Sequence, residues 1–189
     1  MKIGVLALQG AFIEHQKMLA GLQVDSIDVR LPEHLDSIDG LIIPGGESTT
    51  IGKLAEAYNL IGPIQTFAKT RPIWGTCAGM IFMAKKIDHA SQQILKIMDI
   101  QVQRNAFGRQ VDSFLTSLDI PELDGSPFPG IFIRAPAVVD YGPEVQVLSC
   151  LPDGRIVAVK EKNWLATAFH PELTDDNRFH QFFLDMIDS

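Results

Sequence analysis

One cysteine lies between two glycines in the segment Trp-Gly-Thr-Cys-Ala-Gly-Met at positions 74–80. The spacing Gly75-x-Cys77-x-Gly79 is typical of a nucleophile elbow, a sharp strand-to-helix turn that exposes its central side chain. The residues two positions away must be small, because the backbone approaches itself closely in such a turn. A helix that begins at Ala78 would place its positive end under the Cys77 sulfur and favour the thiolate. The same pattern also fits a buried cysteine in a tight turn.

A second glycine pair follows the apolar run Leu41-Ile-Ile43, in the sequence Pro-Gly-Gly-Glu-Ser-Thr. Backbone without side chains can bring an N–H group close to a ligand. We therefore expect the N–H groups of Gly46 and Ala78 to form an oxyanion hole. A plain glycine turn explains the local sequence equally well. The Gly-Lys-Ser/Thr ending of a phosphate-binding loop is absent, and Glu47 would repel a phosphate.

His170 is the histidine that the sequence best places to act as a base. It follows the strand-like run 164–169 and precedes Pro171, which favours extended backbone at His170. Side chains at i and i+2 of an extended chain point the same way, so Glu172 would reach the His170 ring. Cys77, His170 and Glu172 would then supply a nucleophile, a base and an orienting carboxylate. The alternative is a His-Pro turn beside a solvated glutamate, which is favoured unless the cysteine turn is considered with it.

The remaining histidines and the second cysteine show no comparable context. Polar or helical surroundings indicate solvated side chains at four positions: His15, His34, His89 and His180. Two of these, His15 and His180, could instead cap a helix or pack. Cys150, in Val-Leu-Ser-Cys-Leu-Pro, is expected to be structural.

Two arginines near strand ends, Arg104 and Arg134, could each hold a substrate carboxylate with two hydrogen bonds, although most arginines are solvated. The sequence has no Cys/His cluster with zinc spacing and no dinucleotide fingerprint after a strand. We therefore expect neither a metal nor a cofactor.

The elements that position these residues alternate between strand and helix in the first half of the chain. Strands are expected at Lys2–Gln9, Val24–Val29, Leu41–Ile43 and Pro72–Trp74. Helices are expected at Phe12–Ala20, from a Ser48 or Thr49 cap to about Tyr58, and at Ile64–Lys69, Ala78–Lys86 and Arg178–Ile187. This alternation predicts an α/β fold with a parallel sheet. Turn sequences within residues 97–169 indicate antiparallel additions, so the central sheet would be mixed and mainly parallel.

Composition narrows the class of protein. The chain has 189 residues, 46% of them hydrophobic and 21% charged, which predicts one soluble domain over residues 1–189. The net charge of −7 argues against nucleic-acid binding, which requires a basic face. The first apolar run is short and lacks a cleavage site, and no run approaches the ~20 apolar residues of a membrane span. Two cysteines make no disulfide framework, so a cytoplasmic location is expected.

Together these motifs resemble the class I, or triad, glutamine amidotransferases. Gly75-Thr-Cys-Ala-Gly79 and His170-Pro-Glu172 carry the likeness. Four other segments are similar to the family of glutaminase subunits of pyridoxal 5'-phosphate synthase: Gly4–Phe12, Pro44–Thr49, Arg104–Gln110 and Phe132–Pro136. The resemblance implies a three-layer, flavodoxin-like amidotransferase fold over the whole chain.

The resemblance also implies a reaction. Cys77 would attack the carboxamide of L-glutamine, and His170 would protonate the departing ammonia. Water would then hydrolyse the glutamyl thioester to glutamate. Residue by residue, the resemblance assigns contacts with glutamine to Gly46, Glu47, Ser48, Arg104, Ile133 and Arg134.

A partner follows from the same resemblance. A (β/α)8-barrel synthase subunit would join the ammonia to ribose 5-phosphate and glyceraldehyde 3-phosphate, in an assembly of twelve synthase and twelve glutaminase subunits. The isolated chain would be nearly inactive, and pyridoxal phosphate would be the product of the complex, not a cofactor of this chain. The alternatives are a glutaminase subunit of the imidazole glycerol phosphate synthase type, a free-standing γ-glutamyl cysteine hydrolase and a non-catalytic docking subunit.

Overall fold

The computed structural model describes residues 1–108 and 112–188, so the last two positions of the Arg104–Gln110 motif lie outside the described residues. The strands are β1 (Lys2–Leu6), β2 (Asp25–Val29), β3 (Gly40–Ile43), β4 (Ile73–Thr76), β5 (Ala84–Ile87), β6 (Met98–Gln103), β7 (Ser113–Leu118), β8 (Phe128–Ile133), β9 (Ala137–Tyr141), β10 (Gln146–Cys150), β11 (Ile156–Glu161) and β12 (Trp164–Thr167). The helices are α1 (Phe12–Gly21), α2 (Ser48–Ala57), α3 (Ile61–Phe67), α4 (Ala78–Met83) and α5 (Arg178–Asp188), with 3-10 helices η1 (Pro32–Ser37) and η2 (Pro171–Leu173).

A mixed central sheet joins most of the strands. Its order is β2-β1-β3-β4-β12-β11-β9-β6-β5, and β10 pairs with β11. The strands from β2 to β12 along this order pair in parallel, whereas β11 pairs antiparallel with β12, β9 and β10. β3 and β4 are buried at every position, because helices cover both faces of the parallel part. The α/β fold with a mixed sheet that the sequence predicts is therefore confirmed.

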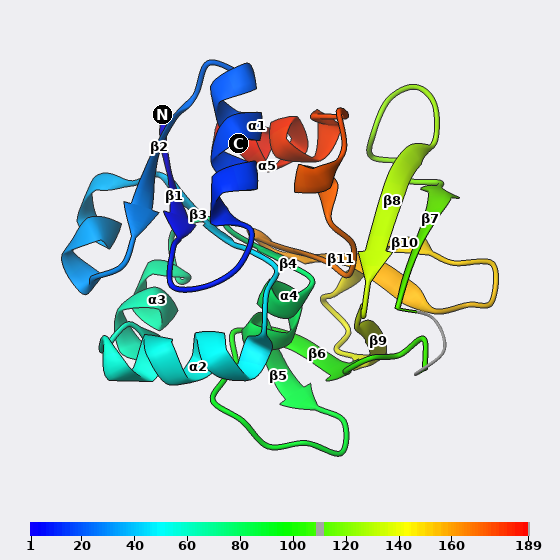
Figure 1. The fold of residues 1–189 in the computed structure, drawn as a ribbon, viewed down its shortest axis with the longest axis horizontal. Helices are drawn as coiled ribbons and strands as arrows, with labels where there is room; N and C mark the ends of the chain where they lie inside the picture. The colour runs from blue at the N-terminus through cyan, green and yellow to red at the C-terminus, as the bar shows by residue number, and fades with distance from the viewer. Residues whose placement is uncertain (109–111, 189) are drawn as a thin grey trace.

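The helices form layers on both sides of this sheet. Figure 1 shows α1 and α5 on one side, and α2 and α3 on the other. The antiparallel pair β7–β8 stands beside α5, away from α1. A continuous cluster of buried apolar side chains, including Trp74, Phe128 and Phe179, fills the space between the sheet and its helices. Each such large side chain stabilises the fold by about 1.5–3 kcal/mol relative to leaving it in water. In the part of the chain that the structure describes, no helix is both long enough and apolar enough to span a bilayer.

The boundaries of several elements differ from the prediction. The helix after Cys77 ends at Met83, not Lys86, because residues 84–87 form β5 and pair in parallel with β6. The first strand ends at Leu6, and α3 begins at Ile61, ahead of the expected start. Tertiary pairing overrides the apolar helical spacing after Met83, since β6 offers that segment a hydrogen-bonding partner.

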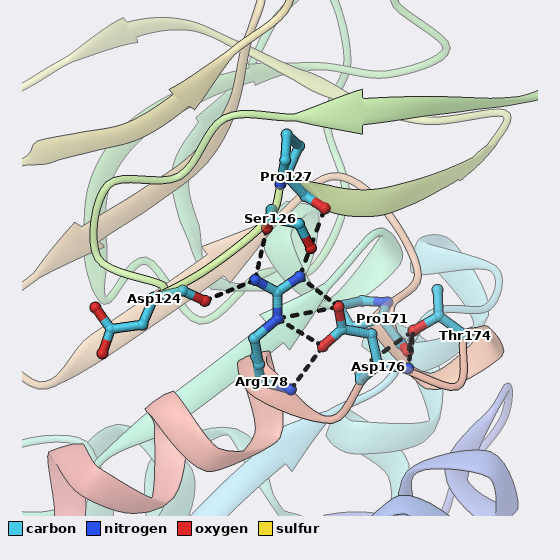
Figure 2. Close-up of polar contacts among 7 residues, drawn as sticks. All are labelled: Asp124, Ser126, Pro127, Pro171, Thr174, Asp176 and Arg178. Atoms are coloured by element: carbon cyan, nitrogen blue, oxygen red, sulfur yellow. Dashed lines mark hydrogen bonds and ion pairs between the residues drawn. The ribbon is translucent and has the colours of Figure 1, made fainter.

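Arg178, the first residue of α5, ties the segment that follows η2 to the loop before β8. Its Nη1 donates to the carbonyl oxygens of Asp124 and Ser126, at 2.9 and 2.6 Å. Its Nε and Nη2 donate to the carboxylate of Asp176, at 3.0 and 2.5 Å. Figure 2 shows the guanidinium between these two groups. The clamp holds α5 and η2 in place relative to β8.

We expect Arg178→Met to lower the free energy of unfolding by about 2 kcal/mol, because the charge-assisted hydrogen bonds are lost while the apolar stem remains. Urea denaturation measures this change. The matched control is Arg30→Met, whose exposed ion pair with Asp28 is expected to contribute below about 1 kcal/mol. Equal losses in the two variants would contradict the role of the clamp.

Candidate active site

Cys77 occupies the turn between β4 and α4 in a strained backbone conformation. Its φ is 47° and its ψ is −102°, a positive-φ geometry that L-residues rarely adopt. The Cys77 N–H donates to the carbonyl of Thr167 at 2.7 Å, and the Cys77 carbonyl accepts from Ile81 at 3.3 Å. The strand-to-helix turn that the sequence predicts is thus present, and hydrogen bonds on both sides hold it.

The two glycines of the elbow are required by close backbone contacts. A Cβ atom added at Gly75 would lie 2.6 Å from the Gly79 carbonyl carbon. A Cβ atom added at Gly79 would lie 2.0 Å from the carbonyl oxygen of Ile43. Both distances are far below van der Waals contact, so only glycine lets α4 pack this closely on β3 and β4.

His170 and Glu172 converge on the elbow. His170 Nδ1 lies 2.7 Å from Glu172 Oε1, and the His170 ring and Cys77 both pack against Gly45. β8 holds this arrangement in place. Its Ile131 carbonyl accepts from the His170 N–H at 2.8 Å, and its Ile133 carbonyl lies 3.7 Å from Cys77 Sγ, which donates to it. The nucleophile, the base and the carboxylate are all buried.

The route by which Glu172 reaches the ring differs from the expected one. Glu172 lies in the 3-10 helix η2, not in an extended strand. Pro171 occupies the first position of η2, where its fixed φ and missing N–H suit the start of a helical turn. The predicted contact between His170 and Glu172 is therefore made across one tight turn.

The charges of this pair stabilise each other in a buried setting. Burial lowers the pKa of His170, but interactions with Cys77 and with the ionised Glu172 outweigh it and raise that pKa to about 10. Burial also opposes ionisation of Glu172, yet His15 and His170 hold the pKa of its carboxyl below the usual range. The geometry thus favours an imidazolium–carboxylate pair at neutral pH.

The predicted oxyanion turn packs directly against these groups. A Cβ atom at Gly45 would lie 2.4 Å from His170 Cε1 and 3.4 Å from Cys77 Cβ. The Gly45 N–H donates to Thr76 Oγ1 at 3.0 Å, and the Gly45 carbonyl accepts from the Ala11 N–H at 3.0 Å. These two bonds fix the peptide that carries the Gly46 N–H.

Glu47, Ser48 and Arg104 gather beside this turn. Arg104 donates to Glu47 Oε1 at 3.4 Å and to Gln92 Oε1 at 3.0 Å, and the buried Ser48 hydroxyl donates to the same Gln92 oxygen at 3.4 Å. Gln92 is a hub that sequence reasoning missed, because the segment around it carries no recognisable motif. Ile133 approaches the site through its carbonyl, whereas the Arg134 side chain is largely exposed and pairs with Asp112 at 3.5 Å.

Glu47 itself caps α2, where a Ser48 or Thr49 cap was expected. Its carboxylate accepts from the N–H groups of Thr49 and Thr50, at 3.1 and 2.7 Å. Slight burial opposes ionisation, but these bonds and one from the Thr50 hydroxyl outweigh it and lower the pKa of Glu47 to about 2. A negative charge at this helix N-terminus also interacts favourably with the helix dipole.

His15 and His180 are not solvated, and that expectation is wrong. Both are fully buried behind Glu172. Helical spacing with the apolar residues Phe12 and Leu19 places His15 on the inward face of α1, a signal that could have indicated burial. His89 is exposed, as expected, and Cys150 lies on β10 with an exposed side chain. The described residues contain no group of three or more His, Cys, Asp or Glu side chains that could hold a metal ion.

Comparisons with known proteins agree with this fold. The model of the SNO glutamine amidotransferase family matches residues 5–189. A pyridoxal 5'-phosphate synthase subunit PdxT from Herpetosiphon aurantiacus is 57% identical over 98% of this chain and 100% of its own length. A PdxT subunit from Carboxydothermus hydrogenoformans is 52% identical over 99% of this chain and 98% of its own length. A solved glutamine amidotransferase superimposes with a TM-score of 0.94 at 44% identity, over 99% of both chains. The chain belongs to the SNO glutamine amidotransferase family.

A methyl group at Gly79 should disrupt the elbow. We expect Gly79→Ala to lower the free energy of unfolding by about 2 kcal/mol or more, because the added atom meets a backbone carbonyl that cannot turn away. The matched control is Gly62→Ala in α3, where an added Cβ meets nothing within 4 Å and should stabilise the helix by about 0.5–1 kcal/mol. Thermal or urea unfolding of both variants measures the difference, and a neutral Gly79→Ala would contradict the packing described.

The buried pair should make stability depend on pH. The folded-state pKa of His170 is raised from 6.5 to about 10, so the charged ring stabilises the folded chain fully below pH 6.5. This contribution is lost as the pH rises through the folded-state value. His170→Asn and Glu172→Gln should therefore be less stable than the wild type by a gap that narrows between pH 6.5 and about 10. Urea titrations at several pH values measure the gap, and a constant or widening gap would contradict the ion pair.

Proposed function

We propose that this chain is the glutaminase subunit of a pyridoxal 5'-phosphate synthase. It hydrolyses L-glutamine to L-glutamate and ammonia and passes the ammonia to a synthase subunit. The hydrogen bond between His170 and Glu172, beside Cys77 at the glycine turn, is the observation that carries this proposal. The near full-length identity to relatives named as such subunits supports the same activity.

The chemistry follows from the roles of the three side chains. The Cys77 thiolate attacks the carboxamide carbon of glutamine, and the carbonyl oxygen takes up the negative charge. The N–H groups of Gly46 and Ala78 stabilise that oxyanion. Protonated His170 gives its proton to the nitrogen, which leaves as ammonia, and a glutamyl thioester remains on Cys77. His170, now neutral, takes a proton from water as the water attacks the thioester, which releases glutamate and the Cys77 thiolate.

The charged groups beside the glycine turn would recognise the amino-acid end of glutamine. Arg104 offers a guanidinium to the α-carboxylate, and ionised Glu47 offers a carboxylate to the α-ammonium group. In the structure the Arg104 and Glu47 side chains form an ion pair with each other. Bound glutamine would replace that ion pair, with its α-carboxylate on Arg104 and its α-ammonium group on Glu47. Ser48, Ile133 and Arg134 complete the proposed binding set. Of these, Arg134 would have to turn away from Asp112 to reach the substrate.

The chain acts as a single domain that docks on a synthase subunit. Residues 1–189 form one amidotransferase domain, supported by a buried core that runs through its elements. The partner is a (β/α)8-barrel synthase, in an assembly of twelve copies of each subunit as the family resemblance implies. The cytoplasm is the proposed location, because a reducing compartment keeps the Cys77 thiol available.

Ammonia release from glutamine tests the function. We expect the chain alone to release almost none, and the chain mixed with the barrel synthase to release it at a clearly higher rate. Cys77→Ala should abolish release, because the sulfur that attacks the carboxamide is removed, while the variant should still bind the synthase. Equal activity with and without the synthase would indicate a free-standing hydrolase. If the wild-type chain binds the synthase but the mixture releases no ammonia, a glutaminase role is excluded and only a docking role remains.

Selective labelling tests the nucleophile independently of turnover. A glutamine analogue with an electrophile at the carboxamide position should modify Cys77 and spare Cys150, because it binds where the elbow presents the sulfur. Iodoacetamide, which has no such recognition, should modify the exposed Cys150 more readily than the buried Cys77. Peptide mass spectrometry reads both reactions. Modification of Cys150 in preference to Cys77 by the glutamine analogue would contradict a glutamine site at Cys77.

A further inference from the structure

A buried hydrogen-bond chain lies behind Glu172, and the reaction described above makes no use of it. His15 Nδ1 lies 3.0 Å from His180 Nε2. His15 Nε2 lies 3.5 Å from Glu172 Oε2 and 3.2 Å from Thr76 Oγ1. The chain joins α1 and α5 to η2 and to the end of β4. The Trp74 ring meets the rings of His15 and His180 at close to right angles, and so fixes their planes.

The direction of these hydrogen bonds follows from the carboxylate. An unprotonated His15 Nε2 would turn a lone pair toward the negatively charged Glu172 Oε2, so this nitrogen carries the proton. His15 Nδ1 then has to accept, and His180 Nε2–H is the donor within reach. His180 Nδ1, buried and without a partner, is left with a lone pair and not with an unsatisfied N–H. The His15 Nε2–H then donates to Thr76 Oγ1, and it lies beside Glu172 Oε2, a buried oxygen with no hydrogen-bond partner among the described residues.

Both rings act as neutral donors in this arrangement. Burial lowers the pKa of His15. The negative charges of Glu172 and Glu14 raise that pKa and the positive charge of His170 lowers it, so the pKa stays below its usual value. Burial, and then the neighbouring His15, lower the pKa of His180 well below its usual value. The two oxygens of Glu172 thus have different surroundings. The charged His170 ring holds Oε1, and the neutral His15 ring faces Oε2.

The same histidine also reaches the glycine turn. Thr76 Oγ1, which lies beside His15 Nε2, accepts the hydrogen bond from the Gly45 N–H at 3.0 Å. One imidazole nitrogen therefore contacts both the carboxylate that orients the base and the hydroxyl that holds the turn beside Cys77. The clamp at Arg178 fixes the start of α5 two residues before His180 (Figure 2), which limits the movement of that ring.

We propose that His15, oriented by His180, is a positioning residue of the glutaminase reaction. Through Glu172 it sets the direction of the His170 ring, and through Thr76 it sets the place of the Gly45 peptide. This inference rests on the proposed function. It predicts that loss of the His15 donor lowers kcat while the affinity for glutamine is kept, because His15 lies behind the catalytic residues.

The test measures kcat and KM for glutamine in the complex with the synthase. We expect His15→Leu to lower kcat about tenfold or more, because Glu172 Oε2 loses its polar neighbour and Thr76 loses a hydrogen bond, with KM changed less than about twofold. His15→Gln should recover much of this loss, since its amide can donate from near the position of Nε2. The matched control is Phe183→Leu on the same buried face of α5, also packed on Trp74. It should lower stability but leave kcat within about twofold.

A wild-type kcat in a folded His15→Leu variant would overturn the inference about His15 and leave the proposed function untouched. A kcat of His15→Gln that is no higher than that of His15→Leu would do the same. An equal loss of kcat in Phe183→Leu would also overturn it, because the effect would then be one of packing. If His15→Leu does not fold, Thr76→Val removes the hydroxyl at nearly constant volume. The inference predicts a reduced kcat for it, and wild-type kcat would overturn the inference. A wild-type complex that releases no ammonia would overturn the proposed function, and the inference with it.

Discussion

The side chain of Glu172 has no exposure to solvent, yet the site requires its negative charge. A buried carboxylate is costly unless charges and hydrogen-bond donors surround it. The His170 ring compensates one oxygen, and the His15 ring faces the other. These partners come from the end of β12 and from α1, so a single buried charge explains why the N-terminal helix and the C-terminal strands must meet. His180 on α5 extends the same requirement to the last helix.

The parallel part of the sheet makes this meeting possible. β3, β4 and β12 are adjacent and parallel, so their carboxyl ends lie at one edge. Gly45, Cys77 and His170 follow these three strands, and ligand sites of open α/β sheets lie at such edges. The close contacts of Gly45 with His170 and of Gly79 with Ile43 show how tightly these ends pack. Larger residues at either glycine would push the nucleophile and the base apart.

Residues whose roles depend on local sequence could be predicted. The elbow at Cys77 and the pairing of His170 with Glu172 need only a few neighbouring residues, and both are present in the structure. What the sequence did not indicate depends on tertiary contacts. Residues 84–87 form a strand because they pair with β6. Gln92 accepts a hydrogen bond from Arg104 only because the tertiary fold brings the two residues together. In the sequence, His15 is a polar residue on a predicted helix. It is buried beside a carboxylate only because η2 and α5 pack against α1.

Nitrogen NMR of the chain with 15N-labelled histidine rings tests most directly whether a buried ion pair organises the site. His170→Asn and His15→Gln variants would assign the signals. At pH 7 both ring nitrogens of His170 should carry protons, whereas His15 should be neutral with its proton on Nε2. Glu172→Gln should return the His170 ring toward the neutral form. A neutral His170 at pH 7, or a charged His15, would contradict a buried ion pair between His170 and Glu172 as the organiser of the site.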